Sequence, residues 1–281
     1  MLARHSKYFD FETPLAEAKQ VIFGAPFDGT TSNRPGTRFA PGLMRIDAIN
    51  LESYSPYQDR DLAELKVADI GDLDLPFGNP KRVLDLVEKQ SLDLLELGKI
   101  PVMIGGEHLL TLGAVKAART VYPNLELIHL DAHTDLRTEY LGESLSHATV
   151  IRHCYDLLGL GRIHSYGIRS GLQEEFQFAK SHLDFHPFDL SAMVDLKEKL
   201  AETPVYVTID LDVLDPAFFP GTGTPEPGGV TFKELLTGLA QLKGLNIVAF
   251  DLVELSPPYD SSGISSQAAC KVLREMLFIS D

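Results

Sequence analysis

Two aspartates and a histidine alternate in one short stretch of the sequence, Asp131-Ala132-His133-Thr134-Asp135. The stretch follows residues 125–130, a mostly apolar run that predicts a buried strand. Alternate residues of a strand lie on one side, so Asp131, His133 and Asp135 point the same way if the chain stays extended. Two carboxylates and an imidazole on one side of a strand end would make half of a metal site, although a solvated turn with an incidental histidine has the same sequence.

The same kind of ending follows two other strand-like runs. Residues 205–209 lead into a further pair of aspartates, and residues 100–104 are followed by a histidine. In an open parallel sheet the carboxyl ends of the strands form the binding crevice, so these side chains would converge. Four carboxylates so close together repel one another strongly, and two divalent cations would cancel their charge. The sequence therefore predicts a two-metal site with six ligands: His108, Asp131, His133, Asp135, Asp210 and Asp212.

The ligand types favour manganese. Carboxylates suit magnesium, calcium and manganese, whereas imidazole suits zinc, iron and nickel, and a mixed set lies between the two groups. Asp131 and Asp210 are the candidates to bridge two ions, because each begins its pair of ligands. Two ions roughly 3.5–4 Å apart can share a bound water and lower its pKa toward ~7. The predicted reaction class is hydrolysis of an electrophilic carbon by a manganese-bridging hydroxide.

Strands and helices alternate along the chain, which predicts helices on both faces of a mainly parallel sheet. The fold class is therefore α/β, a three-layer α/β/α arrangement with an eight-stranded sheet, and no linker or repeat divides the single domain expected over residues 1–281. The long connections over residues 25–42, 136–146 and 215–229 are expected to be loops near the site. The expected strands cover residues 20–24, 65–70, 100–104, 125–130, 163–168, 183–186, 205–209 and 246–253, and the expected helices cover residues 79–98, 109–120, 190–200, a segment beginning at Thr231, and residues 265–278.

Composition limits the partners. The formal net charge of -15 argues against nucleic acid and favours, weakly, a small cationic substrate. The sequence has no run of about 18 apolar residues, so no membrane span is expected. The two cysteines, Cys154 and Cys270, are too few for a disulfide framework, and residues 1–7 lack the apolar continuation of a signal peptide. A cytoplasmic location is the simplest expectation.

Several ordered motifs resemble those of the ureohydrolases, the family of arginases and agmatinases, and look most similar to bacterial agmatinases. The resemblance extends from about Val21 to Phe278 and implies an arginase-like fold. It implies one manganese held by His108, Asp131, Asp135 and Asp210, and a second held by His133, Asp131, Asp210 and Asp212. Relatives suggest a trimer or hexamer. The motifs are residues 105–108, 131–135, 208–216, 221–225 and 251–254, with Pro26, Asp28, residues 34–36 and Pro41.

The resemblance also implies roles for residues that are not ligands. Glu254 matches the family's guanidinium-binding glutamate, as suits a carboxylate facing a planar cation, and Thr224 matches a threonine near the guanidinium. His147 matches the proton shuttle, for which a near-neutral pKa is expected. Glu107 stands where most members have aspartate. The remaining histidines are expected to be structural or exposed, with His129 placed off the ligand side of its strand: His5, His129, His153, His164, His182 and His186.

Arg137 bears on the choice of substrate. Arginases have an asparagine at this place that grips the amino-acid end of arginine, so Arg137 speaks against that substrate. The implied reaction is hydrolysis of agmatine to putrescine and urea, a step of polyamine biosynthesis. Arg137 could instead receive a carboxylate, which leaves guanidinobutyrate open beside guanidine, formiminoglutamate and arginine. An inactive metal- or polyamine-binding regulator and a single-zinc deacetylase-like enzyme are the alternatives outside the family's activities.

Overall fold

The computed structural model of the chain describes residues 7–281. Its centre is an eight-stranded sheet in the order β4-β1-β5-β10-β9-β6-β7-β8, and every neighbouring pair in it is parallel. All eight strands lie within a few residues of the predicted runs, so the predicted sheet is confirmed. The strands are β1 (Gln20–Ala25), β4 (Val67–Asp72), β5 (Ile100–Gly105), β6 (Glu126–Leu130), β7 (Ile163–Tyr166), β8 (Asp184–His186), β9 (Pro204–Asp210) and β10 (Asn246–Val253).

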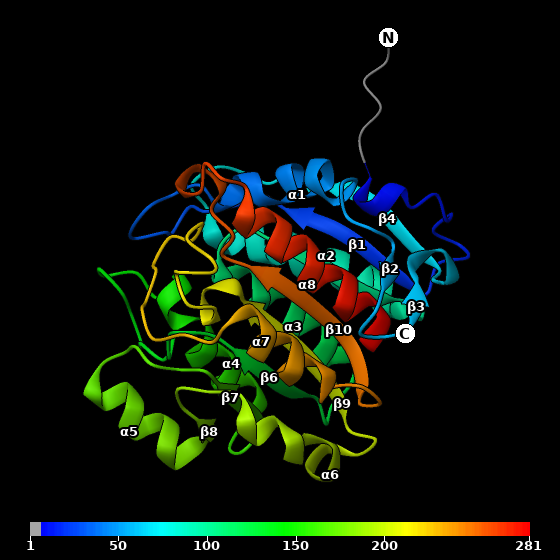
Figure 1. Cartoon of the computed structure of the whole chain (residues 1–281). Helices are drawn as coiled ribbons and strands as arrows, with labels where there is room; N and C mark the ends of the chain where they lie inside the picture. Colours follow the sequence, from blue (N-terminus) through cyan, green and yellow to red (C-terminus); the bar gives the residue numbers. More distant parts are fainter. Residues whose placement is uncertain (1–6) are drawn as a thin grey trace.

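Helices cover both faces of this sheet, which confirms the three-layer arrangement (Figure 1). Each face has its own hydrophobic core, because alternate strand residues point to opposite sides. In β1, Ile22 packs into one core while Val21 and Phe23 pack into the other. The first core is covered by α1 (Ala40–Ala48), α6 (Leu196–Leu200), α7 (Phe232–Ala240) and α8 (Ile264–Ile279), and the second by α2 (Pro80–Glu96), α3 (Thr111–Val121), α4 (Val150–Leu158) and α5 (Gln173–His182).

Some local predictions were wrong or incomplete. The loop expected over residues 25–42 ends earlier, because residues 40–42 begin α1. Pro41 occupies the first turn of this helix and needs no helical N–H partner. The helix expected over residues 190–200 is a 3-10 turn followed by the short α6. Helices α4 and α5 and the hairpin of β2 (Tyr54–Ser55) and β3 (Arg60–Asp61) were not predicted.

Eight 3-10 turns complete the described chain. They are η1 (Tyr8–Asp10), η2 (Thr37–Phe39), η3 (Leu62–Glu64), η4 (His108–Leu110), η5 (His147–Thr149), η6 (Ser191–Asp195), η7 (Leu211–Val213) and η8 (Pro257–Tyr259). Among the described residues, no helix combines the length and the apolar character needed to cross a bilayer. His5 and most of the N-terminal stretch considered for a signal peptide lie outside the described residues.

Candidate metal centre

The four central strands of the sheet deliver the predicted side chains to one place. His108 follows β5 and Asp131 follows β6, while Asp210 ends β9 and Asp212 lies in the turn after it. Glu254 directly follows β10, which lies between β5 and β9. Because all four strands are parallel, their carboxyl ends meet at one edge, and residues far apart in the sequence become neighbours.

One group of side chains surrounds the Nδ1 atom of His108. This atom lies 3.1 Å from Oδ2 of Asp131, 3.3 Å from Oδ2 of Asp135 and 3.3 Å from Oδ2 of Asp210. All four side chains are buried, yet Nδ1 makes no hydrogen bond within residues 7–281. Buried polar atoms normally have a partner, so a lone imidazole nitrogen facing three carboxylate oxygens fits a bound cation.

A second group lies beside the first and shares one carboxylate with it. His133 Nδ1 is 3.0 Å from Asp212 Oδ2 and 3.5 Å from Asp131 Oδ1. Asp131 therefore presents one oxygen to each group, as a bridging ligand would. Asp210 turns Oδ2 toward His108, while its Oδ1 accepts a hydrogen bond from the backbone N–H of Asp212 at 2.9 Å. The ligand atoms of Asp131, His133 and Asp212 lie close enough together to hold a metal ion, and so do those of His108, His129 and Asp131.

An extended chain was expected through residues 131–135, but the structure has a turn there. Strand β6 ends at Leu130, and Asp135 has a positive φ of 50°. Asp131 Oδ1 accepts the backbone N–H of His133 at 2.6 Å, which tightens the turn. A left-handed backbone is unfavourable for a residue other than glycine, and such strain is concentrated at functional sites. Asp135 therefore reaches His108 by a turn and not by strand alternation.

His129 lies on the ligand side of β6, and the expectation that it lay off that side was wrong. It precedes Asp131 by two residues, so both side chains share a side of the strand. Its Nε2 lies 2.9 Å from Asp131 Oδ2, and its Nδ1 lies 3.1 Å from the Ser165 hydroxyl. Burial lowers the pKa of His129, so its neutral ring donates to the Asp131 carboxylate and orients it.

A buried hydrogen-bond network orients His108 from behind. Its Nε2 lies 3.0 Å from Thr208 Oγ1, and the Thr208 hydroxyl donates to Asp251 Oδ1 at 2.7 Å. Thr111 and Tyr206 donate to Asp251 Oδ2 at 2.8 and 2.6 Å. Because Thr208 donates its only hydroxyl proton to Asp251, its oxygen accepts a hydrogen bond from His108 Nε2. The Nδ1 atom of His108 is then free to bind a cation. The alternate spacing of Tyr206 and Thr208 on β9 is the sequence signal that could have predicted this network.

Burial and mutual repulsion disfavour the charged forms of several aspartates in the cluster. Burial raises the pKa of Asp135 to about 6, and the neighbouring Asp131 carboxylate adds to the effect. Burial also raises the pKa of Asp210 well above its ordinary value, with Asp212 adding to it. Burial disfavours the charge on Asp131 as well, but the three neighbouring imidazoles of His108, His129 and His133 outweigh it and hold its pKa well below normal. A divalent cation among these oxygens would favour the charged forms of all of them.

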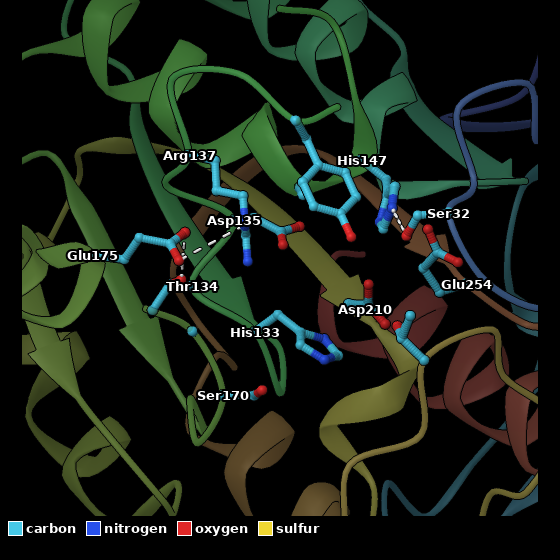
Figure 2. Close-up of a pocket in the computed structure, with 14 residues that line it drawn as sticks. Ser32, His133, Thr134, Asp135, Arg137, His147, Ser170, Glu175, Asp210 and Glu254 are labelled. Carbon is cyan, nitrogen blue, oxygen red and sulfur yellow. Dashed lines mark hydrogen bonds and ion pairs between the residues drawn. The ribbon is translucent and has the colours of Figure 1, made fainter. Parts of the chain in front are cut away.

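The cluster opens into a pocket that also holds the predicted residues that are not ligands (Figure 2). Glu254 and His147 lie on one side of this pocket, and Arg137 lies on the other with Glu175. The predicted site residues in its lining are His133, Asp135, Arg137, His147, Asp210, Thr224 and Glu254.

Glu254 is held in a strained conformation beside the cluster. Its φ is 65°, its N–H donates to Gly106 O at 3.0 Å, and its Oε1 accepts the N–H of His108 at 2.7 Å. Burial raises its pKa well above the ordinary value, and the nearby Glu107 and Asp212 add to this effect. A guanidinium in the pocket would restore the carboxylate charge and pair with it. Thr224 contacts a predicted metal ligand, because its Oγ1 lies 3.4 Å from Asp212 Oδ2.

His147 contacts the loop that follows β1: its Nε2 lies 2.9 Å from the Ser32 hydroxyl (Figure 2). The pKa of His147 is lowered to about 4, chiefly by burial and in part by the nearby imidazoles of His133 and His108. The near-neutral pKa expected from the sequence is therefore wrong for this structure. A ring that is neutral at neutral pH must take up a proton before it can pass one on.

Arg137 is held against two neighbours at the rim of the pocket. Its guanidinium lies over the Tyr140 ring at 4.7 Å, and its Nε is 4.0 Å from Glu175 Oε2. Glu175 also accepts hydrogen bonds from Thr134 Oγ1 and Leu136 N at 2.9 and 3.1 Å. These contacts connect the loop over residues 136–146 to the beginning of α5.

A buried cluster of this composition at the carboxyl edge of a parallel sheet is typical of a metal-dependent hydrolase. Comparison with known proteins agrees: the arginase family model matches residues 18–279, and the chain belongs to that family. An agmatinase of Bacillus subtilis is 50% identical over 93% of this chain and 91% of its own. A guanidinobutyrase of Pseudomonas aeruginosa is 33% identical over 92% of this chain and 85% of its own. A solved structure from Clostridium difficile has a TM-score of 0.92 and 45% identity, covering 95% of this chain and 99% of the other.

Proposed function

We propose that the protein hydrolyses agmatine to putrescine and urea, a step of polyamine biosynthesis. The observation that carries the proposal is that Glu254 lines the same pocket as His133, Asp135 and Asp210. A carboxylate of the kind that pairs with a guanidinium thus lies beside carboxylates and imidazoles of the kinds that bind cations. The similarity to the B. subtilis agmatinase supports agmatine as the guanidinium compound.

Two manganese ions are the proposed cofactors. One would be held by His108, Asp131, Asp135 and Asp210, and the other by His133, Asp131, Asp210 and Asp212. When bound, two such ions cancel the carboxylate charge and make water acidic enough to supply hydroxide at neutral pH. The mixed oxygen and nitrogen donor set supports manganese over zinc or magnesium.

The protein's own side chains would orient the substrate and move protons. Glu254 would pair with the guanidinium and hold its carbon toward the cluster, which supplies proximity and orientation. The oxygen of water bonds to that carbon, the bond from carbon to the chain nitrogen breaks, and the leaving amine takes up a proton. His147, neutral at neutral pH, would accept a proton from water and deliver it to that amine. Thr224 would contact the guanidinium from the side of Asp212.

A panel of substrates tests this proposal. Manganese-loaded protein should release urea from agmatine, with an equal amount of putrescine, faster than from guanidinobutyrate, guanidine or arginine, and should release no formamide from formiminoglutamate. Guanidinobutyrate is the second candidate, because Arg137 lines the pocket and could pair with its carboxylate. Faster turnover of guanidinobutyrate than of agmatine would replace the proposed substrate. Binding of agmatine without release of urea would instead favour the inactive regulator.

A homo-oligomer, a trimer or a hexamer, is proposed from the family resemblance. Light scattering of the manganese-loaded protein during size-exclusion chromatography would measure its mass. A monomer at working concentration would contradict this part of the proposal.

A further inference from the structure

The loop after β1 lines the pocket through Ser32 and contacts His147. Ser32 on this loop lines the pocket, and its hydroxyl lies 2.9 Å from Nε2 of His147 (Figure 2). The backbone N–H of His147 donates to the Thr30 hydroxyl on the same loop at 3.0 Å. One loop therefore fixes both the backbone and the ring of His147.

Glu107 anchors this loop from beneath. Its side chain is fully buried and accepts the Thr30 N–H at 2.8 Å, the Thr30 hydroxyl at 2.6 Å and the Thr31 hydroxyl at 3.4 Å. Its own N–H donates to Phe27 O at 2.9 Å. A buried carboxylate with several donors to it is a strong and directional anchor.

The backbone of Gly106 packs closely against the loop that follows β1. The N–H of Gly106 donates to Ala25 O at 3.0 Å, and a Cβ at Gly106 would lie 1.8 Å from Phe27 O. Only glycine permits so close an approach of two backbones. The position of the loop is therefore set by the chain that also carries His108.

The Thr30 hydroxyl connects the anchor to His147. It has one proton, which it gives to Glu107 Oε1, so its oxygen accepts the N–H of His147. An isosteric valine would break both bonds, whereas serine would keep both. Thr31 bonds to the same carboxylate, and its described hydrogen bond runs to Glu107 and not to His147.

We propose that Thr30 and Glu107 are positioning residues for His147, and that Ser32 sets the orientation of its ring. They hold the imidazole where it can exchange protons with the reacting groups. Thr30 and Glu107 are not part of the described pocket lining and would act through His147. The proposal rests on the proposed role of His147 as proton shuttle. Misplacing a catalytic group by about 1 Å can cost about a hundred-fold in rate, so the loss of such a bond should be measurable.

The experiment compares Thr30→Val with Thr30→Ser and Thr31→Val in manganese-loaded protein. Thr30→Val should lower kcat for agmatine about ten-fold with KM changed less than about two-fold, and should alter the pH–rate profile of kcat. Thr30→Ser should restore kcat to within about two-fold of wild type, and Thr31→Val should behave like Thr30→Ser. Manganese content and melting temperature, measured for each variant, should match wild type.

A second readout does not depend on catalysis. Diethyl pyrocarbonate should label His147 several-fold faster in Thr30→Val than in wild type or Thr30→Ser, as measured by peptide mass spectrometry, because the loop bonded to Nε2 is released. Equal labelling in all variants, or equal kcat in Thr30→Val and Thr30→Ser, would overturn the positioning role. Failure of the proposed function would differ: wild-type protein would release no urea, or His147→Ala would leave kcat unchanged, whatever the labelling.

Discussion

The Nε2 atom of His108 lies 3.0 Å from the hydroxyl oxygen of Thr208. This contact decides which ring nitrogen carries the proton, because Thr208 gives its own proton to Asp251. A residue of β9 and a residue of β10 thereby prepare a ligand that follows β5. Such outer contacts of metal-binding histidines commonly change metal affinity by about 10–100-fold when removed.

Thr208→Val should therefore weaken manganese binding by about 10–100-fold, whereas Thr208→Ser should bind as wild type does. Valine keeps the shape but removes the acceptor for His108 Nε2, so the ring loses its preferred tautomer and orientation. Titration of the bound manganese with a chelator, followed by elemental analysis, measures the effect. Equal affinities of the valine and serine variants would contradict the role assigned to the hydroxyl.

Asp210→Ala should remove most of the bound manganese and nearly all urea release. Its Oδ2 is one of three carboxylate oxygens around His108 Nδ1, and its loss leaves too few ligands in that group. Elemental analysis after dialysis and a urea assay measure the two effects. Asp189 is exposed and bonded to Ser191, so Asp189→Asn is the matched control and should keep both properties. An unchanged metal content in Asp210→Ala would show that Asp210 is not a ligand.

Glu254→Gln should lower kcat/KM for agmatine about a hundred-fold while manganese stays bound. The amide keeps the size of the side chain and can still accept the N–H of His108, but it cannot balance the guanidinium charge. Steady-state urea release and metal content measure the two parts. Retained kcat/KM in this variant would mean that another group binds the guanidinium.

His164 should stabilise the fold more at acidic than at alkaline pH. Its ring nitrogens lie 2.8 Å from Asp184 Oδ2 and 2.7 Å from Glu126 Oε2. Burial by itself lowers the pKa of His164, but the bonds to these two carboxylates outweigh burial and raise it. A raised folded pKa stabilises the fold fully below the unfolded pKa of about 6.5. That contribution is lost as the pH rises through the folded pKa.

His164→Gln should therefore lower the free energy of unfolding by about 1–3 kcal/mol near pH 5.5 and by less near pH 9. Urea denaturation at the two pH values measures the difference from wild type. His153→Gln, which removes an imidazole bonded to the Ser144 carbonyl, is the control. A difference that grows with pH would contradict the assigned ion pairs.

Most of the strands were predictable because they are short apolar runs that end in turn formers, and the packing on both faces demands such runs. The edge strand β8, Asp184–His186, is half-buried and less apolar. The helices were harder to predict from the sequence. Neither α4 nor α5 was predicted, and α1 begins with Ala40-Pro41-Gly42, residues that also form turns. His129 was misplaced although its spacing from Asp131 already put both on one side of β6.

The residue types in the sequence were enough to predict a cation site: six side chains of the kinds that bind cations, at or just after the ends of strands that meet at one edge of a parallel sheet. How these side chains meet depends on the folded chain. Asp131 faces both His108 and His133, Asp135 arrives by a left-handed turn, and burial sets the pKa of His147 to about 4. Spacing along a strand is a local property of the chain, whereas distance, burial and charge at the site depend on segments that only folding brings together.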